Sequence, residues 1–143
     1  MTIAAILKHK GAAVASVAPA DTIATLAHTL HERRIGAVLV LDTAGTLLGI
    51  VSERDIVANL ARHGAATLDM TAAQLMTTGL HTATRATTVP QAMALMTERR
   101  VRHLPIVEDG RLLGLVSIGD VVKAHADLQA HEVDSLKAYV AGG

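Results

Sequence analysis

Apolar residues recur every three or four positions in two stretches of the chain that share one spacing. The first set is Ile23, Leu26, Ala27 and Leu30, and the second is Val89, Ala92, Met93 and Met96. Positions i, i+3, i+4 and i+7 lie on one face of an α-helix. The pattern therefore predicts an amphipathic helix in each half of the chain.

Two runs of apolar residues follow each predicted helix, and a short polar turn separates them. The first runs cover residues 37–42 and 104–109, the turns 43–46 and 109–111, and the second runs 47–52 and 112–117. Short apolar runs bounded by turn residues are typical of strands, and a close pair of them predicts a hairpin.

A second helix is predicted after each hairpin, and a short strand before each first helix. The helices cover residues 53–64 and 118–128, with Gly64 as a stop signal, and the strands cover 13–19 and 80–84. Each half then has the order strand, helix, strand, strand, helix. This order predicts an α+β architecture in which the helices cover one face of a small sheet.

The two halves also align residue by residue, so the chain is an internal duplication. Residues 21–42 match 87–108, and after one deleted residue Ser52 matches Ser117 and Asp55 matches Asp120. The lead-in segments 2–7 and 71–76 agree loosely. We expect a first motif with its lead-in at 1–66, a second at 67–126 and a helical tail at 127–143, with 61–70 as connector.

Composition limits the classes of function. The chain has 143 residues, half of them apolar, and Tyr139 is its only aromatic residue, so the core must be aliphatic. Thirteen basic residues balance thirteen acidic ones. Nucleic-acid binders usually show a basic surplus and, for single strands, aromatic stacking platforms. We therefore expect no nucleic-acid partner.

The sequence shows no cysteine and no recognisable targeting or membrane-spanning segment. Cysteine is absent, which excludes disulfides and thiolate chemistry. The charges at the N-terminus follow a short apolar stretch, the reverse of a secretory signal, and no apolar run approaches the ~20 residues that span a bilayer. We expect a soluble cytoplasmic protein without a membrane partner.

The candidate chemistry lies where the second strand of each hairpin meets the following helix. Ser52-x-x-Asp55 and Ser117-x-x-Asp120 both fit a capping box, in which serine and an acid satisfy backbone groups of the first turn. The same geometry suits a ligand site, because a helix start favours phosphate and a carboxylate accepts hydrogen bonds from ribose hydroxyls. Both interpretations stay open from the residues alone.

The duplication, with its "GIVSERD" and "RHLPIVEDGRLLGLVSIGD" stretches, resembles a tandem pair of cystathionine β-synthase (CBS) domains over residues 10–126. The tail resembles the C-terminal helix of small stand-alone bacterial CBS-pair proteins. The resemblance implies two pseudo-symmetric β-α-β-β-α motifs packed as a CBS pair, or Bateman module. It also implies a regulatory sensor that binds AMP, ADP, ATP or S-adenosylmethionine in clefts between the motifs, with AMP or ATP favoured.

The resemblance also implies roles for individual residues. Asp55 and Asp120 would hold the ribose, with Ser52 and Ser117 beside them. The two sites differ in their further candidate ligand-binding residues. The second half carries the basic pair Arg102 and His103 and the proline Pro105, and the first half has neither at the matching positions. The first half instead has Arg54 inside its junction. A solvated strand end is the alternative for the basic pair.

Other chemistry is poorly supported. His28, His31 and Glu32 share a helix face, but no further ligand follows at recognisable spacing, and no catalytic constellation is evident. We therefore expect neither a metal site nor an enzyme. No effector domain is visible, so a sensor would signal to a partner in trans. We expect a homodimer, extended by Val133, Leu136 and Val140 unless this stripe folds back. The alternative function is a scaffolding dimer that binds no ligand.

Overall fold

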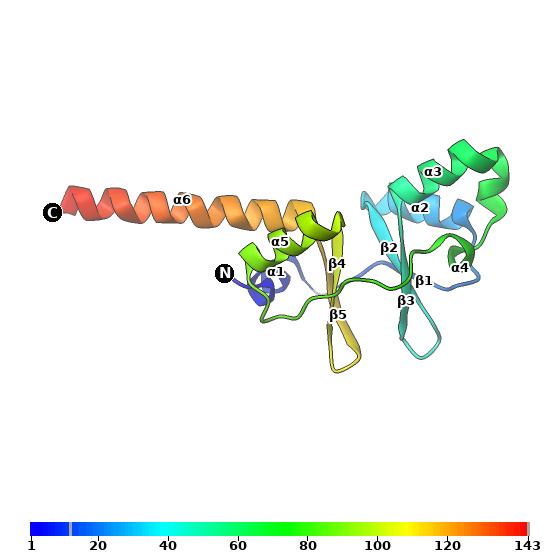
Figure 1. Cartoon of the computed structure of the whole chain (residues 1–143), viewed down its shortest axis with the longest axis horizontal. Helices are drawn as coiled ribbons and strands as arrows, with labels where there is room; N and C mark the ends of the chain where they lie inside the picture. The colour runs from blue at the N-terminus through cyan, green and yellow to red at the C-terminus, as the bar shows by residue number, and fades with distance from the viewer. Residues whose placement is uncertain (12, 143) are drawn as a thin grey trace. The chain divides into compact units, whose positions relative to one another are not determined.

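The chain forms two compact units, each built mainly from one of the two repeats (Figure 1). The computed structural model describes residues 1–11 and 13–142, except for the side chains of residues 135 and 138–142. The first-repeat unit contains Ala13–His81 and also Asp109–Leu112, which is a hairpin turn and the first two residues of the strand that follows it. The second-repeat unit contains the N-terminal segment, Thr82–Glu108 and the chain from Leu113 onward.

The first-repeat unit has a three-stranded sheet with helices around it. Its elements are β1 (Ser16–Val17), α2 (Ile23–Arg33), β2 (Ala37–Leu41), β3 (Leu47–Ser52), α3 (Glu53–His63), the 3-10 helix η1 (Gly64–Asp69) and α4 (Ala72–Leu75). The sheet order is β1-β2-β3, with β1 parallel to β2 and β2 antiparallel to β3. Both predicted helices and the hairpin are confirmed, and the predicted strand at 13–19 is shortened to two residues.

The second-repeat unit repeats this plan with a reduced sheet. Its elements are α1 (Ile3–Lys10), α5 (Val89–Arg99), β4 (His103–Glu108), β5 (Arg111–Ser117) and α6 (Ile118–Gly142). The predicted strand at 80–84 is wrong as a strand, because only Ala83 forms a bridge to Ile106. Its N–H donates to Pro105 O at 3.0 Å, and its carbonyl accepts from Val107 N at 3.0 Å.

The last helix is longer than its sequence pattern predicted. We expected a helix over 118–128 and a helical tail from 127, and the structure joins the two into one continuous helix, α6, of 25 residues. The physical reason is the absence of a stop signal, since no Gly or Pro occurs between Val121 and Ala141. The corresponding helix α3, in contrast, ends at His63 with Gly64 as its cap.

The lead-in segments are exchanged between the repeats. Helix α1 begins the chain, yet Ile3, Ile6 and Leu7 are buried in the aliphatic core of the second-repeat unit. Helix α4 precedes the second repeat, yet Ala72 and Leu75 are buried in the core of the first-repeat unit. The compact units therefore group the lead-ins differently from the sequence division at 66/67, because each lead-in buries its apolar face on the other repeat.

Backbone hydrogen bonds fix both lead-ins in equivalent ways. In the second-repeat unit, Ile3 N donates to Thr87 O at 2.9 Å and Val89 N donates to Met1 O at 3.0 Å. In the first-repeat unit, Ile23 N donates to Met70 O and Ala72 N donates to Asp21 O, both at 2.8 Å. Each lead-in thus contacts the start of the first helix of the repeat that it covers.

A glycine in the second strand of each hairpin allows the lead-in to approach. A Cβ at Gly49 would lie 2.7 Å from the backbone oxygen of Thr77 and 2.8 Å from Met76 Sδ. A Cβ at Gly114 would lie 2.7 Å from Leu7 Cδ2. Real Cβ atoms do not come this close to other atoms, so a side chain at either position requires a shift of its neighbours.

We predict that Gly49→Ala lowers the free energy of unfolding by about 1–3 kcal/mol, the usual effect of overpacking. Gly114→Ala should cost less, because Leu7 can rotate away whereas the Thr77 backbone cannot. Gly119→Ala is the control, since its Cβ would meet only Ser117 Oγ at 3.6 Å, and it should be neutral or slightly stabilising. Urea denaturation of the three variants measures this order, and equal effects at all three positions would contradict it.

Candidate functional site

The junction between β3 and α3 is a reciprocal capping box. Ser52 N and Ser52 Oγ both donate to Asp55 Oδ2, each at 2.9 Å. Asp55 N donates back to Ser52 Oγ at 3.2 Å. The serine is the N-cap of α3 and the aspartate its third residue, so two free backbone N–H groups of the first turn are satisfied.

The junction between β5 and α6 has the same geometry. Ser117 N and Ser117 Oγ donate to Asp120 Oδ2 at 2.8 Å and 2.9 Å, and Asp120 N donates to Ser117 Oγ at 3.2 Å. The capping interpretation of the repeated Ser-x-x-Asp pattern is therefore confirmed in both copies. Ligand binding by the same residues stays a prediction, which the capping contacts do not oppose because they use only one oxygen of each carboxylate.

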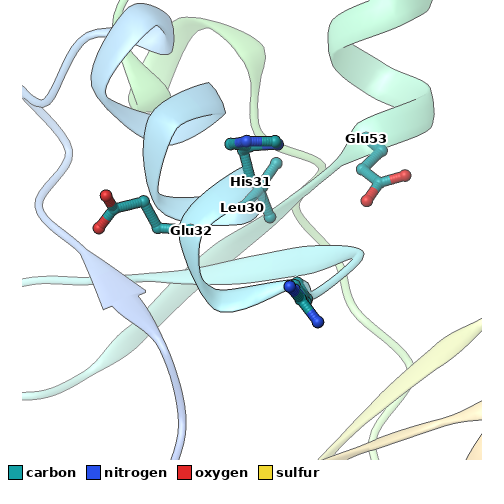
Figure 2. Close-up of a pocket in the computed structure, with 5 residues that line it drawn as sticks. Leu30, His31, Glu32 and Glu53 are labelled. Atoms are coloured by element: carbon teal, nitrogen blue, oxygen red, sulfur yellow. The ribbon is translucent and has the colours of Figure 1, made fainter.

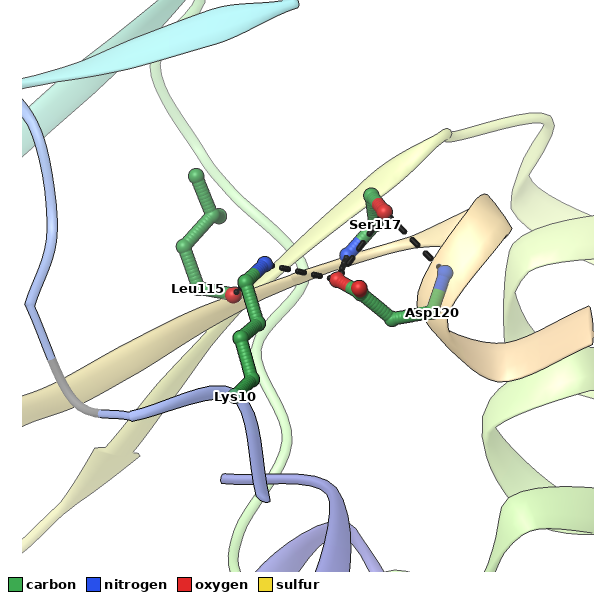
Figure 3. Close-up of polar contacts among 4 residues, drawn as sticks. All are labelled: Lys10, Leu115, Ser117 and Asp120. Carbon is green, nitrogen blue, oxygen red and sulfur yellow. Dashed lines mark hydrogen bonds and ion pairs between the residues drawn. The ribbon is translucent and has the colours of Figure 1, made fainter. Parts of the chain in front are cut away.

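One cation distinguishes the second junction. Lys10, the last residue of α1, donates from Nζ to Asp120 Oδ2 at 2.6 Å and to Leu115 O at 2.9 Å (Figure 3). The side chains of Lys10 and Asp120 are 39% and 25% exposed. A pair this accessible to water contributes about 0–1 kcal/mol to stability. Asp55 forms no ion pair with any other residue that the structure describes.

Opposing influences act on the carboxyl group of Asp120. Partial burial has the largest single effect and by itself would raise its pKa. The hydrogen bonds from Lys10 and from Ser117, together with the positive charge of Lys10, outweigh this effect and hold the pKa of Asp120 below its ordinary value. The carboxylate is therefore charged at neutral pH and available as an acceptor.

Of the predicted basic pair Arg102 and His103, it is Arg102 that is hydrogen-bonded through its backbone to the start of α6. Ile118 N, at the start of α6, donates to Arg102 O at 2.8 Å. The equivalent bond at the first junction runs from Glu53 N to Gly36 O at 2.9 Å. The backbone thus brings Arg102 to the helix start, where the first repeat has a glycine. The Arg102 side chain is exposed, and His103 is partly buried at the start of β4.

Two predicted site residues occupy different surroundings. Pro105 is buried within β4, and its carbonyl accepts the hydrogen bond from Ala83. Arg54 is exposed in the first turn of α3.

The sequence did not predict the part that Lys10 plays at the second junction. Its only signal was the run of basic residues Lys8, His9 and Lys10 at the end of a helix, which is also the usual complement to a helix dipole.

An open hollow lies next to the first junction, at the end of α2 and the start of α3. It is lined by Leu30, His31, Glu32, Arg34 and Glu53 (Figure 2). Charges of both signs border it, and it includes none of Ser52, Arg54 and Asp55. Glu32 and Glu53 outnumber Arg34, so the lining has no surplus of positive charge for a phosphate, and the chemistry favours the capping-box junctions as the candidate site.

Within residues 1–11 and 13–142 there is no cluster of three or more potential metal ligands. His28 and Glu32 approach each other at 3.5 Å on α2, both largely exposed. In the same part of the chain, every helix is too short or too polar to cross a bilayer.

Comparison with known proteins identifies the class. The CBS domain family model matches residues 12–62 and 72–127, so the chain belongs to the CBS domain family and carries two copies of the domain. A CBS domain-containing protein from Agrobacterium tumefaciens is 44% identical and has the same fold, with a TM-score of 0.84 over 87% of this chain and 92% of that one. The α+β CBS-pair fold predicted from the sequence is thereby confirmed.

Two further relatives are informative. The mitochondrial CBS domain-containing protein CBSX3 of Arabidopsis thaliana is 33% identical over 99% of this chain and 73% of its own length. The structure of CBSX2 in complex with AMP is 25% identical, with a TM-score of 0.71 over 90% of this chain and 98% of that one. CBS domain proteins are generally regulatory modules, some of which bind adenosine compounds.

We predict that Asp120→Asn destabilises the protein at pH 7 by about 1 kcal/mol, the usual value of a helix cap. A carboxyl group whose pKa is lower in the folded state stabilises the fold above its unfolded pKa, and this stability is lost as pH falls through the folded pKa. The difference between wild type and variant should therefore shrink below about pH 4.

Urea denaturation between pH 7 and pH 3 measures this difference. Asp127→Asn removes an exposed carboxylate further along α6 and is the matched control, with little expected change. A difference between Asp120→Asn and wild type that is constant over the whole pH range would contradict the prediction.

Proposed function

We propose that this CBS pair is a regulatory module that binds an adenosine-containing nucleotide at its Ser-x-x-Asp junctions. The observation that carries the proposal is the state of the two carboxylates. In each, Oδ2 holds the capping contacts, whereas Oδ1 accepts no hydrogen bond from any residue that the structure describes. Each helix start therefore keeps an acceptor for a ligand without giving up its cap.

The chemistry of these junctions suits a nucleotide. A carboxylate oxygen accepts from a ribose hydroxyl, and a helix N-terminus favours a nearby phosphate. The backbone brings Arg102 to the second junction, His103 follows it at the start of β4, and Arg54 adds a basic side chain at the first junction. AMP or ATP is thus favoured over S-adenosylmethionine, which has no phosphate. A role for Pro105 stays a prediction and would consist of fixing the strand behind His103.

The output of such a module would be a change in affinity for a protein partner in trans. Sensing of the cellular energy state is the corresponding role if AMP and ATP compete. A cytoplasmic location and the lack of enzyme activity also stay predictions. The alternative is a scaffolding dimer that binds no nucleotide, in which the Ser-x-x-Asp junctions serve only as helix caps.

Nucleotide binding should raise the stability of the protein. A ligand at 100 times its dissociation constant adds ~2.7 kcal/mol by mass action. Thermal denaturation with AMP, ADP, ATP, NAD and S-adenosylmethionine at millimolar concentration measures this effect. Curves that are unchanged by all five compounds would favour the scaffold.

Replacing the carboxylates should weaken binding at each junction. We expect Asp120→Asn to weaken AMP binding about 10- to 150-fold, because a charge-assisted hydrogen bond is lost. Asp55→Asn should have a smaller effect on total binding, since Arg102 and His103 lie in the second repeat. Titration calorimetry measures both, with Asp127→Asn as control. If both variants bind AMP like the wild type and both unfold earlier, the motif is only a cap.

We also propose a homodimer formed through exposed apolar faces of α3 and α6. Val57 and Val122 occupy equivalent positions in the repeats and are 64% and 50% exposed. Val133 and Leu136 of the predicted stripe are 50% and 64% exposed, so these two do not fold back onto their own chain. The third member, the side chain of Val140, lies outside the described residues.

Light scattering should give twice the chain mass of 14.9 kDa. Val122→Asp should shift the equilibrium toward monomer, because it places a charge in the apolar contact. Gln129→Asp introduces the same charge at an exposed polar position of α6 and should leave the dimer intact. A monomer at all concentrations in the wild type would contradict the proposal.

A further inference from the structure

The ammonium group of Lys10 takes the place of a backbone donor that the first repeat has. In the first-repeat unit, Ile50 O accepts from Thr77 N at 2.9 Å, and Ile50 N donates to Thr77 O at 3.1 Å. The residue equivalent to Ile50 is Leu115, and its carbonyl accepts from Lys10 Nζ at 2.9 Å. The edge of β3 is therefore hydrogen-bonded to backbone, whereas the equivalent carbonyl on β5 accepts from a lysine side chain.

Lys10 can leave this position more easily than Thr77 can. Its four-carbon stem is flexible, and the ion pair with Asp120 is accessible to water from both sides, with exposures of 39% and 25%. Lys10 Nζ also shares Asp120 Oδ2 with two donors of Ser117. Its departure leaves the capping box intact, so movement of Lys10 does not require α6 to unfold.

We propose that Lys10 makes the second junction selective for 5′-phosphorylated adenosine compounds over adenosine itself. The proposal rests on the proposed nucleotide binding and assigns to Lys10 the discrimination between ligands. It concerns a residue of α1, which lies outside the Ser-x-x-Asp pattern and more than 100 positions from Asp120 in the chain.

The selectivity follows from charge. A ribose has two neighbouring hydroxyls, and when they donate to both oxygens of the Asp120 carboxylate, one of them competes with the Lys10 ammonium for Oδ2. Adenosine offers the displaced ammonium no anion in return, so its binding carries the full loss of the ion pair. A 5′-phosphate is attached to the same ribose ring, within reach of a flexible lysine, and gives the ammonium a new and more highly charged partner.

Among the described residues, the first junction has no equivalent of the Lys10–Asp120 ion pair. Asp55 has no ion pair within the described part of the chain, and the neighbouring charges of Glu53 and Arg54 offset each other. It should bind adenosine and AMP with more similar affinity. The two junctions are then alike in their caps and different in the ligands that they accept.

The experiment compares Lys10→Met with its parent in the full-length chain carrying Asp55→Asn, which weakens the first junction. Titration calorimetry gives the dissociation constants of AMP and of adenosine. We expect Lys10→Met to weaken AMP binding and to strengthen adenosine binding, so that the preference for AMP falls about tenfold or more. Lys8→Met, an exposed lysine on the same helix, should leave the preference unchanged.

A second background tests whether Lys10 acts through Asp120. With Asp120→Asn, the amide no longer holds the ammonium, so Lys10→Met should have a clearly smaller effect on the preference, which is the coupling a double-mutant cycle detects. An equal change of AMP and adenosine affinity, or none, would overturn the inference while nucleotide binding stands. Absence of binding of both compounds to the wild type and all variants would overturn both proposals.

Discussion

Both cores depend on the exchange of the lead-in helices. The chain has no Phe or Trp, so each small sheet must be covered by closely packed aliphatic side chains. Ile3 is fully buried in one unit and Ala72 in the other, each contributed by a segment from outside the repeat that it covers. Gly49 and Gly114 make this approach possible. Without the exchanged segments, one side of each hairpin would lose its apolar cover.

The same exchange explains why two nearly identical junctions acquire different surroundings. The capping contacts of Asp55 and Asp120 agree within 0.1 Å for each pair of atoms. The lead-ins differ in length, because α4 stops at Leu75, whereas α1 continues to Lys10. The longer helix carries a positive charge to one carboxylate. A duplicated scaffold thus acquires two junctions with unlike surroundings through a difference in the covering segment, while the capping contacts of serine and aspartate stay the same.

The elements that depend on neighbouring residues could be predicted from the sequence. Periodicity was sufficient for α2 and α5, turn residues for both hairpins, and serine with aspartate three positions later for both caps. The end of α6 was also within reach, because its uninterrupted run without Gly or Pro is visible in the sequence. The tail from residue 127 was correctly predicted as helical, but it was treated as a segment separate from the helix that precedes it.

The exchange and Lys10 could not be predicted in this way. Both lead-ins are similar in sequence, and both repeats present a glycine at the point of contact, so local pattern does not decide which lead-in covers which repeat. The contact of Lys10 with Asp120 spans 110 positions and follows from that pairing alone. Arg102 was identified through the resemblance to CBS domains, as part of a basic pair before a strand, whereas its nearness to α6 depends on the hydrogen bond from Ile118.

The unbroken course of α6 has a mechanical consequence. Its 25 residues give a rod about 37 Å long, and its first turn is the one that holds Asp120. A rod transmits a small tilt at one end as a larger displacement at the other. If a ligand occupies the Asp120 carboxylate as proposed and tilts the first turn, the displacement grows along the helix. With the start of the helix held at Ser117, the C-terminal end of α6 is then the part of the helix that moves most.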